Sequence, residues 1–313
     1  MTEFGLIDHI RELCRVLPVN GFEGIGDDCA TLPIGDGEAL VFTTDMLIEE
    51  VHFLRAATSA AELGAKALAV NLSDVAAMGA RPVATLLSLA LPREIMDSPW
   101  IEEFMCGYRD LSQRYHTALI GGDTTASTTG IAINVTAIGR ISEQQLKHRA
   151  DAQVGDIIFV GGSLGESGAG LRDILAGHYD TPFAAIHRNP TPQVEEGIWL
   201  GQRREVHAMM DISDGVASDL CHIMERSAVG AEVNTENIPT TVDLETALCG
   251  GEDYKLLFTA DATQLTTLCA DFAAHFGTTI YPIGRITAPC NGKICWLKNG
   301  TPMTTDWHGF RHY

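Results

Sequence analysis

The chain has 313 residues, of which 45% are hydrophobic and 31 are glycine, and its formal net charge is −20 at pH 7. This length suits two domains of ordinary size or one large domain, and the composition is typical of a globular α/β protein. Such an acidic chain lacks the basic surface that nucleic acids or anionic membranes require, which argues against both kinds of partner. A nucleotide could still bind if metal ions reversed the local charge.

The eight cysteines are scattered along the chain and form no CxxC pair. This pattern predicts reduced thiols in a cytoplasmic protein, and neither a zinc site nor a disulfide framework. The N-terminal sequence MTEFGLIDHI is acidic and amphipathic, and it lacks the basic and apolar regions of a signal peptide. No apolar run reaches the length of a membrane span, so no membrane partner is expected.

The first half of the chain alternates between apolar strand-like runs and helix-like segments. Residues 1–20 have the pattern of an amphipathic helix that ends near Pro18. Strands are predicted at 38–45, 83–91, 117–122 and 131–140, and helices at 60–79 and 99–116. This order predicts an α/β sandwich in which helices cover one face of a sheet.

The polar segment 147–156 separates two strand-like runs, so we place a domain boundary there. The first domain is then 1–148 and the second is 149–313. In the second half, strands are predicted at 157–162, 254–260 and 279–286, and helices at 168–177, 191–204, 211–227 and 261–276. Both halves are therefore expected to be α/β domains.

Six short segments place an aspartate or glutamate beside Gly, Ser or Thr. They are GIGDD (24–28), TTD (43–45), NLSD (71–74), GGDT (121–124), DISDG (211–215) and GGED (250–253). None of them is a strong motif alone. Hard cations such as Mg²⁺ take oxygen ligands and reach substrate phosphates through a few carboxylates. Together the segments predict a site that holds several metal ions and a polyphosphate, which points to phosphoryl transfer.

Two pairs of these acids have simpler interpretations. Asp211 and Asp214 lie three residues apart at the start of a predicted helix, where free N–H groups favour anions. N-capping of that helix explains them equally well. Asp45 and Asp123 each follow a strand-like run, where ligands of α/β sheets collect but where acids also form ordinary turns.

Asp74 lies in the middle of an apolar helix beside Asn71 and Ser73, where polar side chains are costly without partners. An arginine or a metal would satisfy it, and the other acids favour the metal. The sequence contains neither the P-loop pattern GxxxxGK[ST] nor the protein-kinase signatures, so both classes are excluded. His52 follows Asp45 closely, but a lone histidine is more often structural than functional.

Seven motifs resemble those of the thiamine-monophosphate kinase family, in the same order and over nearly the whole chain. They are GIGDDCA (24–30), TTDMLIEEVHF (43–53), KALAVNLSDVAAMGARP (66–82), GGDT (121–124), DISDG (211–215), GGEDYKLLFT (250–259) and GFRHY (309–313). That family is similar in fold to aminoimidazole ribonucleotide synthetase, selenophosphate synthetase and a hydrogenase-maturation protein. The resemblance implies an N-terminal α/β domain that dimerises through its sheet and a C-terminal α/β domain that completes the active site.

The activity implied by the resemblance is ATP-dependent phosphorylation of thiamine phosphate to thiamine diphosphate with Mg²⁺, the last step of thiamine diphosphate biosynthesis. The implied Mg²⁺ ligands are Asp28, Thr43, Thr44, Asp45, Asp74, Asp123, Asp211 and Asp214. The implied ATP contacts are Asp28, Thr43, Gly122, Arg149 and Ser213. The implied contacts to thiamine phosphate are His52, Glu252 and a C-terminal aromatic, either Phe310 or Tyr313. Glu50 departs from the family pattern, which usually has Gly there, and it either adjoins the thiazolium or points to solvent.

Two alternatives stay open at this point. The chain could be another member of the same superfamily that acts on a different small acceptor. Selenophosphate synthetase would carry a reactive Cys or Sec in a Gly-rich loop near the N-terminus, and neither Cys14 nor Cys29 is in such a loop. The chain could also be an acidic metal-binding protein without enzymatic activity.

Overall fold

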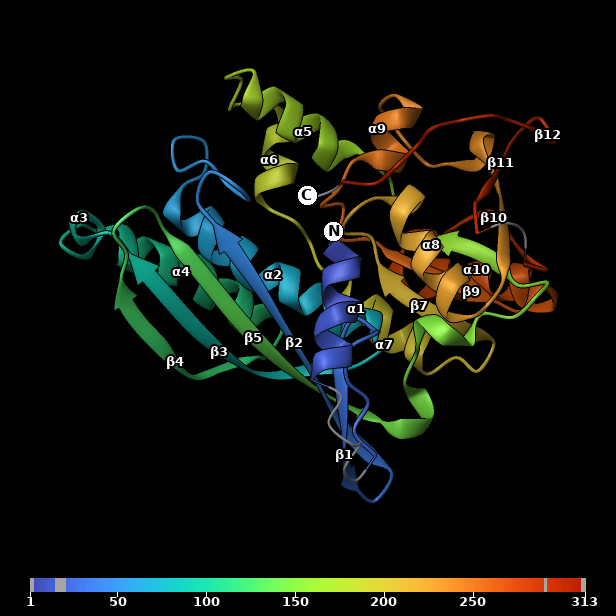
Figure 1. Cartoon of the computed structure of the whole chain (residues 1–313), viewed down its shortest axis with the longest axis horizontal. Helices are drawn as coiled ribbons and strands as arrows, with labels where there is room; N and C mark the ends of the chain where they lie inside the picture. The colour runs from blue at the N-terminus through green and yellow to red at the C-terminus, as the bar shows by residue number, and fades with distance from the viewer. Residues whose placement is uncertain (1–2, 15–20, 290–291, 311–313) are drawn as a thin grey trace.

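The computed structural model describes residues 3–14, 21–289 and 292–310, and it contains two β-sheets that follow one another along the chain (Figure 1). The first sheet has five strands in the order β1-β2-β5-β3-β4, and the second has seven in the order β12-β11-β8-β10-β6-β9-β7. Within the described residues, no helix combines the length and the apolar character that crossing a bilayer requires.

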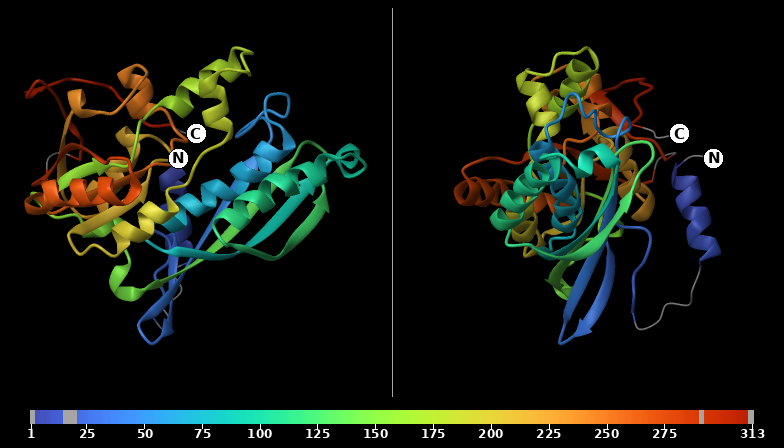
Figure 2. Two further views of the ribbon diagram at one scale, coloured as in Figure 1. Left: turned by 180° about the vertical axis from the view of Figure 1, so that it is seen from behind. Right: turned by 90° about the vertical axis from the view of Figure 1, so that its left-hand side faces the viewer.

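The first sheet is covered on one face by two helices, α2 and α4 (Figures 1 and 2). β3 and β4 are parallel, and the other neighbouring strands are antiparallel. On β5, buried residues that face the helices alternate with more exposed ones, as expected for a sheet with one covered face. The elements are α1 (Glu3–Leu13), β1 (Ala30–Gly35), β2 (Glu38–Ile48), α2 (Ala60–Ala77), β3 (Arg81–Leu91), α3 (Arg93–Met96), α4 (Trp100–Arg114), β4 (Ala118–Ala126) and β5 (Ala132–Ser142).

The second sheet has its own buried core and its own set of helices. Its strands are β6 (Ile157–Val160), β7 (Val206–Asp211), β8 (Gly230–Asn234), β9 (Leu256–Ala260), β10 (Tyr281–Thr287), β11 (Cys295–Lys298) and β12 (Thr301–Pro302). Its helices are α5 (Glu166–Leu175), α6 (Pro182–Arg188), α7 (Val194–Gly201), α8 (Val216–Arg226), α9 (Leu244–Cys249) and α10 (Leu265–Phe276). The predicted two-part α/β fold is confirmed.

Several predicted elements were wrong in extent or type. Asp211 is the last residue of β7 and not part of a helix, because α8 begins only at Val216 after Gly215, whose φ is 101°. N-capping by Asp211 is therefore excluded. β2 continues past Asp45, and β4 continues to Ala126, so Asp45 and Asp123 lie within strands and not in turns. The short elements β1, β7, β8, α6, α9 and β11 were not predicted. Among the described residues the first helix ends at Leu13, and Pro18 lies outside them.

Helix α2 contacts both halves of the fold. It packs on β2 and β5 of the first sheet and also on α7 of the second half. A Cβ at Gly197 would lie 2.3 Å from the carbonyl oxygen of Ala76, so glycine is required for this close approach of α7 to α2. The site described below is built along this helix.

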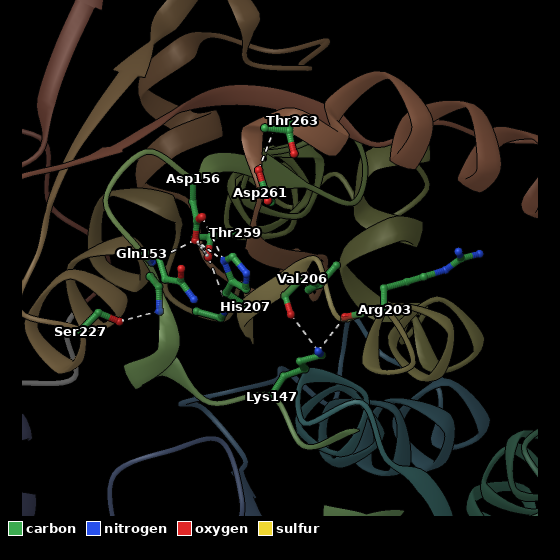
Figure 3. A network of polar contacts seen from close by, with 12 residues as sticks. Lys147, Gln153, Asp156, Arg203, Val206, His207, Ser227, Thr259, Asp261 and Thr263 are labelled. Atoms are coloured by element: carbon green, nitrogen blue, oxygen red, sulfur yellow. Dashed lines mark hydrogen bonds and ion pairs between the residues drawn. The ribbon is translucent and has the colours of Figure 1, made fainter. Parts of the chain in front are cut away.

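The segment that connects the two halves is fixed by buried polar groups (Figure 3). Lys147 Nζ donates to the carbonyl oxygens of Arg203 (2.8 Å) and Val206 (2.7 Å). Asp156 pairs with His207 Nδ1 (2.9 Å) and accepts from Thr259 Oγ1 (3.0 Å). These bonds join residues 147–156 to β7 and β9. The domain boundary between 148 and 149 stays a prediction.

Candidate active site

Three aspartates from distant parts of the chain meet where the two halves adjoin. Asp28 precedes β1, Asp74 lies on α2 and Asp211 ends β7, and each offers a carboxylate oxygen within 4.8 Å of the others. No second group of three or more such ligands occurs in the part of the chain that the structure describes. We call these three residues, together with Asp45, the acid cluster. Asp45 is included because burial and the charge of Asp28 raise the pKa of Asp45, and burial and the charge of Asp45 raise the pKa of Asp74.

The neighbouring hydroxyl and amide groups hold the acid cluster in place. Thr43 Oγ1 donates to Asp74 Oδ2, and Ser73 Oγ donates to Asp211 Oδ2 at 2.5 Å. Asn71 accepts from the backbone N–H of Asp45 at 3.0 Å, which joins α2 to β2. Alternation along β2 turns Thr43 and Asp45 toward α2. The polar residues in the middle of α2 are thus explained by their partners at the site.

The acid cluster carries more negative charge than its neighbours neutralise. Burial, followed by the neighbouring carboxylates, raises the pKa of Asp45 to about 6 and of Asp211 to about 8, and it raises the pKa of Asp74 well above its usual value. Burial also raises the pKa of Asp28, although Arg149 opposes this with two bonds of 2.8 and 3.1 Å. Several buried oxygen donors around one guanidinium form a set that fits divalent cations such as Mg²⁺.

The loop before β1 is held in position by Asp27, the residue that precedes Asp28. Its side chain accepts from the backbone N–H of Arg149 at 3.0 Å and pairs with His148 Nδ1 at 3.1 Å. The φ of Gly26 is 148°, and a Cβ there would lie 2.6 Å from the guanidinium of Arg226. Asp27 therefore fixes the loop while Asp28 faces the cluster. The sequence did not reveal the parts played by His148 and Arg226.

A cavity of about 330 Å³ opens beside the acid cluster. Its polar lining includes Asp45, His52, Lys66 and Glu252. Its apolar lining comes from α5, which contributes Leu171, Ile174 and Leu175, and from the aromatics Phe53 and Phe310. A cavity with an apolar wall, several charged groups and a neighbouring acid cluster suits a small ring-bearing molecule that also carries a phosphate.

Comparisons with known proteins agree with this architecture. Residues 26–141 match the model of "AIR synthase related protein, N-terminal domain", and residues 153–296 match that of the C-terminal domain. The thiamine-monophosphate kinase of Haemophilus influenzae is 40% identical over 100% of this chain and 98% of its own, and that of Escherichia coli K12 is 36% identical over 99% and 98%. The chain belongs to the thiamine-monophosphate kinase family.

A solved structure described as "AaThiL complexed with AMPPCP and TMP" has a TM-score of 0.85 and 31% identity, covering 100% of this chain and 97% of that one. The resemblance predicted from the seven motifs is thereby confirmed. Members of the thiamine-monophosphate kinase family match the chain from end to end, so both of its sheets are part of the shared fold.

The structure brings together most of the residues that the family resemblance implies. Those at the acid cluster are Asp28, Thr43, Asp45, Asp74, Asp211 and Arg149. Those that line the cavity are His52, Ser213, Asp214, Glu252 and Phe310. Tyr313 lies outside the described residues. The individual roles of these residues stay predictions.

Thr44, Gly122 and Asp123 are placed elsewhere. Thr44 Oγ1 donates to the carbonyl of Val135 at 3.2 Å, on the face of the sheet opposite to Thr43. Asp123 is exposed and lies opposite Ser88 in the register of β3 and β4, and Ser88 also faces away from the helices. A Cβ at Gly122 would lie 1.7 Å from the carbonyl oxygen of a β3 residue, so close strand packing accounts for this glycine. The roles that the family resemblance implies for these three residues stay predictions.

The cavity residues that were missed from the sequence include Lys66 and His187. For Lys66 a signal was available, because positions 66, 70 and 74 of a helix share one face and Asp74 was already a candidate. For His187 there was none, because the short helix α6 was not predicted and no motif contains it.

Glu50 also lines the cavity, and its backbone is in the left-handed region with a φ of 67°. We expect Glu50→Gly to increase the free energy of unfolding by about 0.5 to 1 kcal/mol, because glycine adopts this conformation without strain. Chemical denaturation measures the change. Asp36→Gly, at a φ of 55° in the β1–β2 turn, is the control and should give a smaller gain, because Asp tolerates this region better than Glu. A loss of stability in Glu50→Gly would show that the side chain itself stabilises the fold.

Proposed function

We propose that the acid cluster and the adjoining cavity together carry out the family's reaction, in which ATP phosphorylates thiamine phosphate to thiamine diphosphate. The observation that supports this most is the placement of Asp45 in the wall of the cavity and also in the acid cluster. A phosphate of a molecule in the cavity would therefore adjoin the carboxylates that hold metal ions. Glu252 and Phe310 line the same cavity and suit a cationic aromatic ring.

The residues that would hold Mg²⁺ are Asp28, Asp74 and Asp211, with Asp45 beside them. When bound, Mg²⁺ supplies charge neutralisation on the polyphosphate and fixes its orientation. Arg149, already beside Asp28, adds a permanent positive charge on the same side. Thr43 and Ser73 hold two of the carboxylates in place through their hydroxyl groups.

The acceptor in this reaction is a phosphate monoester that is already ionised near neutral pH, so it needs no strong general base. The histidines of the cavity agree with this requirement. His52 Nδ1 accepts from the backbone N–H of Ile48 at 3.0 Å, which fixes the ring. Burial, followed by the charge of Lys66, lowers the pKa of His187 to about 4, so its imidazole is neutral at pH 7. We assign His52 to acceptor binding and not to proton transfer.

A coupled assay of ADP release against a panel of small acceptors tests the proposed function. ATP turnover should depend on both Mg²⁺ and thiamine phosphate. Equal turnover with and without thiamine phosphate would refute the proposal. Turnover stimulated by another acceptor would favour a different member of the superfamily, and Mg²⁺ binding without any turnover would favour a metal-binding protein.

Transfer should be direct, without a phosphoenzyme. A covalent intermediate needs an activated nucleophile with a base beside it, and the aspartates of the site are assigned to metal binding. Incubation with γ-labelled ATP and Mg²⁺ in the absence of acceptor should leave no stable label on the protein. Label that later chases into thiamine diphosphate would contradict direct transfer.

We further propose a homodimer that forms through the outer face of the first sheet. Met46 is 55% exposed and Leu86 is 37% exposed on this face, and every residue of β4 is exposed. Leu86→Glu should convert the dimer to a monomer in sedimentation experiments, whereas Val154→Glu, at an exposed apolar residue away from the sheet, should not. A wild-type monomer mass that does not change with concentration would contradict the dimer.

We place the reaction in the cytoplasm, where ATP is available and where free thiols such as those of the described cysteines persist.

A further inference from the structure

Glu252 is held by two other residues of the cavity wall. Lys66 Nζ donates to Glu252 Oε2 at 2.7 Å and to the carbonyl oxygen of His187 at 3.3 Å. His187 Nε2 lies 3.3 Å from the same Oε2, and its Nδ1 lies 3.0 Å from Ser167 Oγ. Lys66 is 2% exposed and His187 is 7% exposed, so water competes little for these contacts. Four residues from α2, α5, α6 and the loop after α9 thus form one chain of polar contacts.

The protonation states of these four side chains follow from their contacts. Burial opposes ionisation of Glu252, but the charge of Lys66 outweighs it and holds the pKa of the carboxyl below its usual value. An ionised carboxylate only accepts hydrogen bonds, so the 3.3 Å contact between His187 Nε2 and Glu252 Oε2 is favourable in the tautomer that carries the ring proton on Nε2. In that tautomer Nδ1 accepts from the hydroxyl of Ser167, 3.0 Å away.

Regular secondary structure does not fix the Glu252 side chain. Glu252 lies in an irregular segment between α9 and β9, and its φ is 64°, in the left-handed region. Its backbone N–H donates to the carbonyl of Ser213 at 2.7 Å, which anchors the main chain only. The direction of the carboxylate is therefore set by Lys66 and His187.

We propose that Lys66 and His187 are positioning residues that orient the Glu252 carboxylate toward the cationic, N–H-bearing rings of the acceptor. This proposal rests on the proposed function. Both contacts are made to Oε2, and Glu252 lines the cavity, so we assign Oε1 to the acceptor. Lys66 and His187 thereby set acceptor affinity through Glu252 and take no part in the transfer of the phosphoryl group.

Steady-state kinetics of Lys66→Met and His187→Leu test the proposal. The KM for thiamine phosphate should rise roughly 10- to 100-fold, as expected when a buried polar contact to a charged group is lost. The KM for ATP and kcat should stay close to wild type. Lys147→Met is the matched control, because Lys147 is also a buried lysine at the junction of the two halves. Its Nζ donates to the backbone carbonyls of Arg203 and Val206 (Figure 3), and Lys147 does not line the cavity. This substitution should lower stability without changing the KM for thiamine phosphate.

Two further variants separate positioning from a general structural effect. His187→Gln keeps an N–H donor near Nε2 and should restore most of the affinity that His187→Leu loses. Lys66→Met in a Glu252→Gln background should add little to the effect of Glu252→Gln alone, because Lys66 acts through Glu252. If Lys66→Met fails to fold, the comparison of His187→Leu with His187→Gln still tests the proposal.

Unchanged acceptor KM in the folded variants, or equal loss in Lys147→Met, would overturn the positioning roles while leaving the proposed function intact. Absence of acceptor-dependent turnover in the wild type would instead overturn the proposed function, and the positioning roles with it.

Discussion

Asp74→Asn and Asp211→Asn should each reduce kcat by at least about 100-fold, which corresponds to about 3 kcal/mol of lost transition-state stabilisation. Asparagine keeps an oxygen that can accept from Thr43 or Ser73, but it removes the charge that a divalent cation requires. The fold should survive, because each carboxylate in the acid cluster is buried beside others of the same sign. In the absence of metal, both variants should therefore melt at or above the wild-type temperature.

The control for this experiment is Asp156→Asn. Asp156 is buried like Asp211, but it lies in the network with His207 and Thr259 (Figure 3) and does not line the cavity. Its replacement should lower the free energy of unfolding by about 1 to 3 kcal/mol and leave kcat unchanged. Near-normal turnover combined with a lowered melting temperature in Asp74→Asn or Asp211→Asn would show that the residue is structural.

The metal-free protein should lose stability as the pH rises from 6.5 to 8, and Mg²⁺ should reverse that loss. Asp211 has a pKa raised to about 8, so the folded state holds a proton that the unfolded state has already released. Where the folded state binds more protons, stability falls with increasing pH. The pKa of Asp45, raised to about 6, lowers the free energy of unfolding by a further amount of about 3 kcal/mol, and this loss is complete above pH 6.

Other groups restrict the pH range in which this effect is clear. Burial is the main reason that the pKa values of His187 and His222 are lowered to about 4. Because the unfolded state binds more protons at these two residues, they make the protein more stable as the pH rises from 4 to 6.5. Above 6.5 that opposing contribution is complete. Burial raises the pKa of Asp253 to about 7, and the hydrogen bond to Asp27 raises the pKa of His148, so both residues add to the loss of stability above pH 6.5.

Thermal denaturation in chelator and in Mg²⁺ at pH 6.5, 7.2 and 8 measures the effect, with Asp211→Asn as the variant in which the pH dependence should weaken. A Mg²⁺ effect that is equal at all three values would contradict the role of the acid cluster.

The sequence selected residues that lie together in the structure, although it predicted several of the elements that carry them incorrectly. Asp28, Asp74 and Asp211 could be selected because acids beside small residues recur in motifs whose order matches a family. Their meeting point depends on β7, which was not predicted because VHAMMD is short and has no alternating pattern. Asp211 was consequently assigned to the wrong kind of element, although its assignment to the site did not change.

The sequence did not show which face of the first sheet each candidate residue occupies. Thr43 and Thr44 are adjacent and were both assigned to metal binding, yet strand alternation places them on opposite faces. Asp45 and Asp123 are likewise on opposite faces of the sheet. A residue pattern indicates that a strand is present, but the face that each residue occupies depends on the helix that covers the sheet.

Helix α2 carries Lys66 near one end of the site and Asp74 near the other. Their separation of eight positions corresponds to a rise of about 12 Å along a rigid helix. Because Gly197 and the strands of the first sheet pack closely against α2, this spacing cannot adjust to the molecule that is bound. The helix thus acts as a ruler, and the protein should discriminate among acceptors by the length between ring and phosphate more strictly than by substituents on the ring.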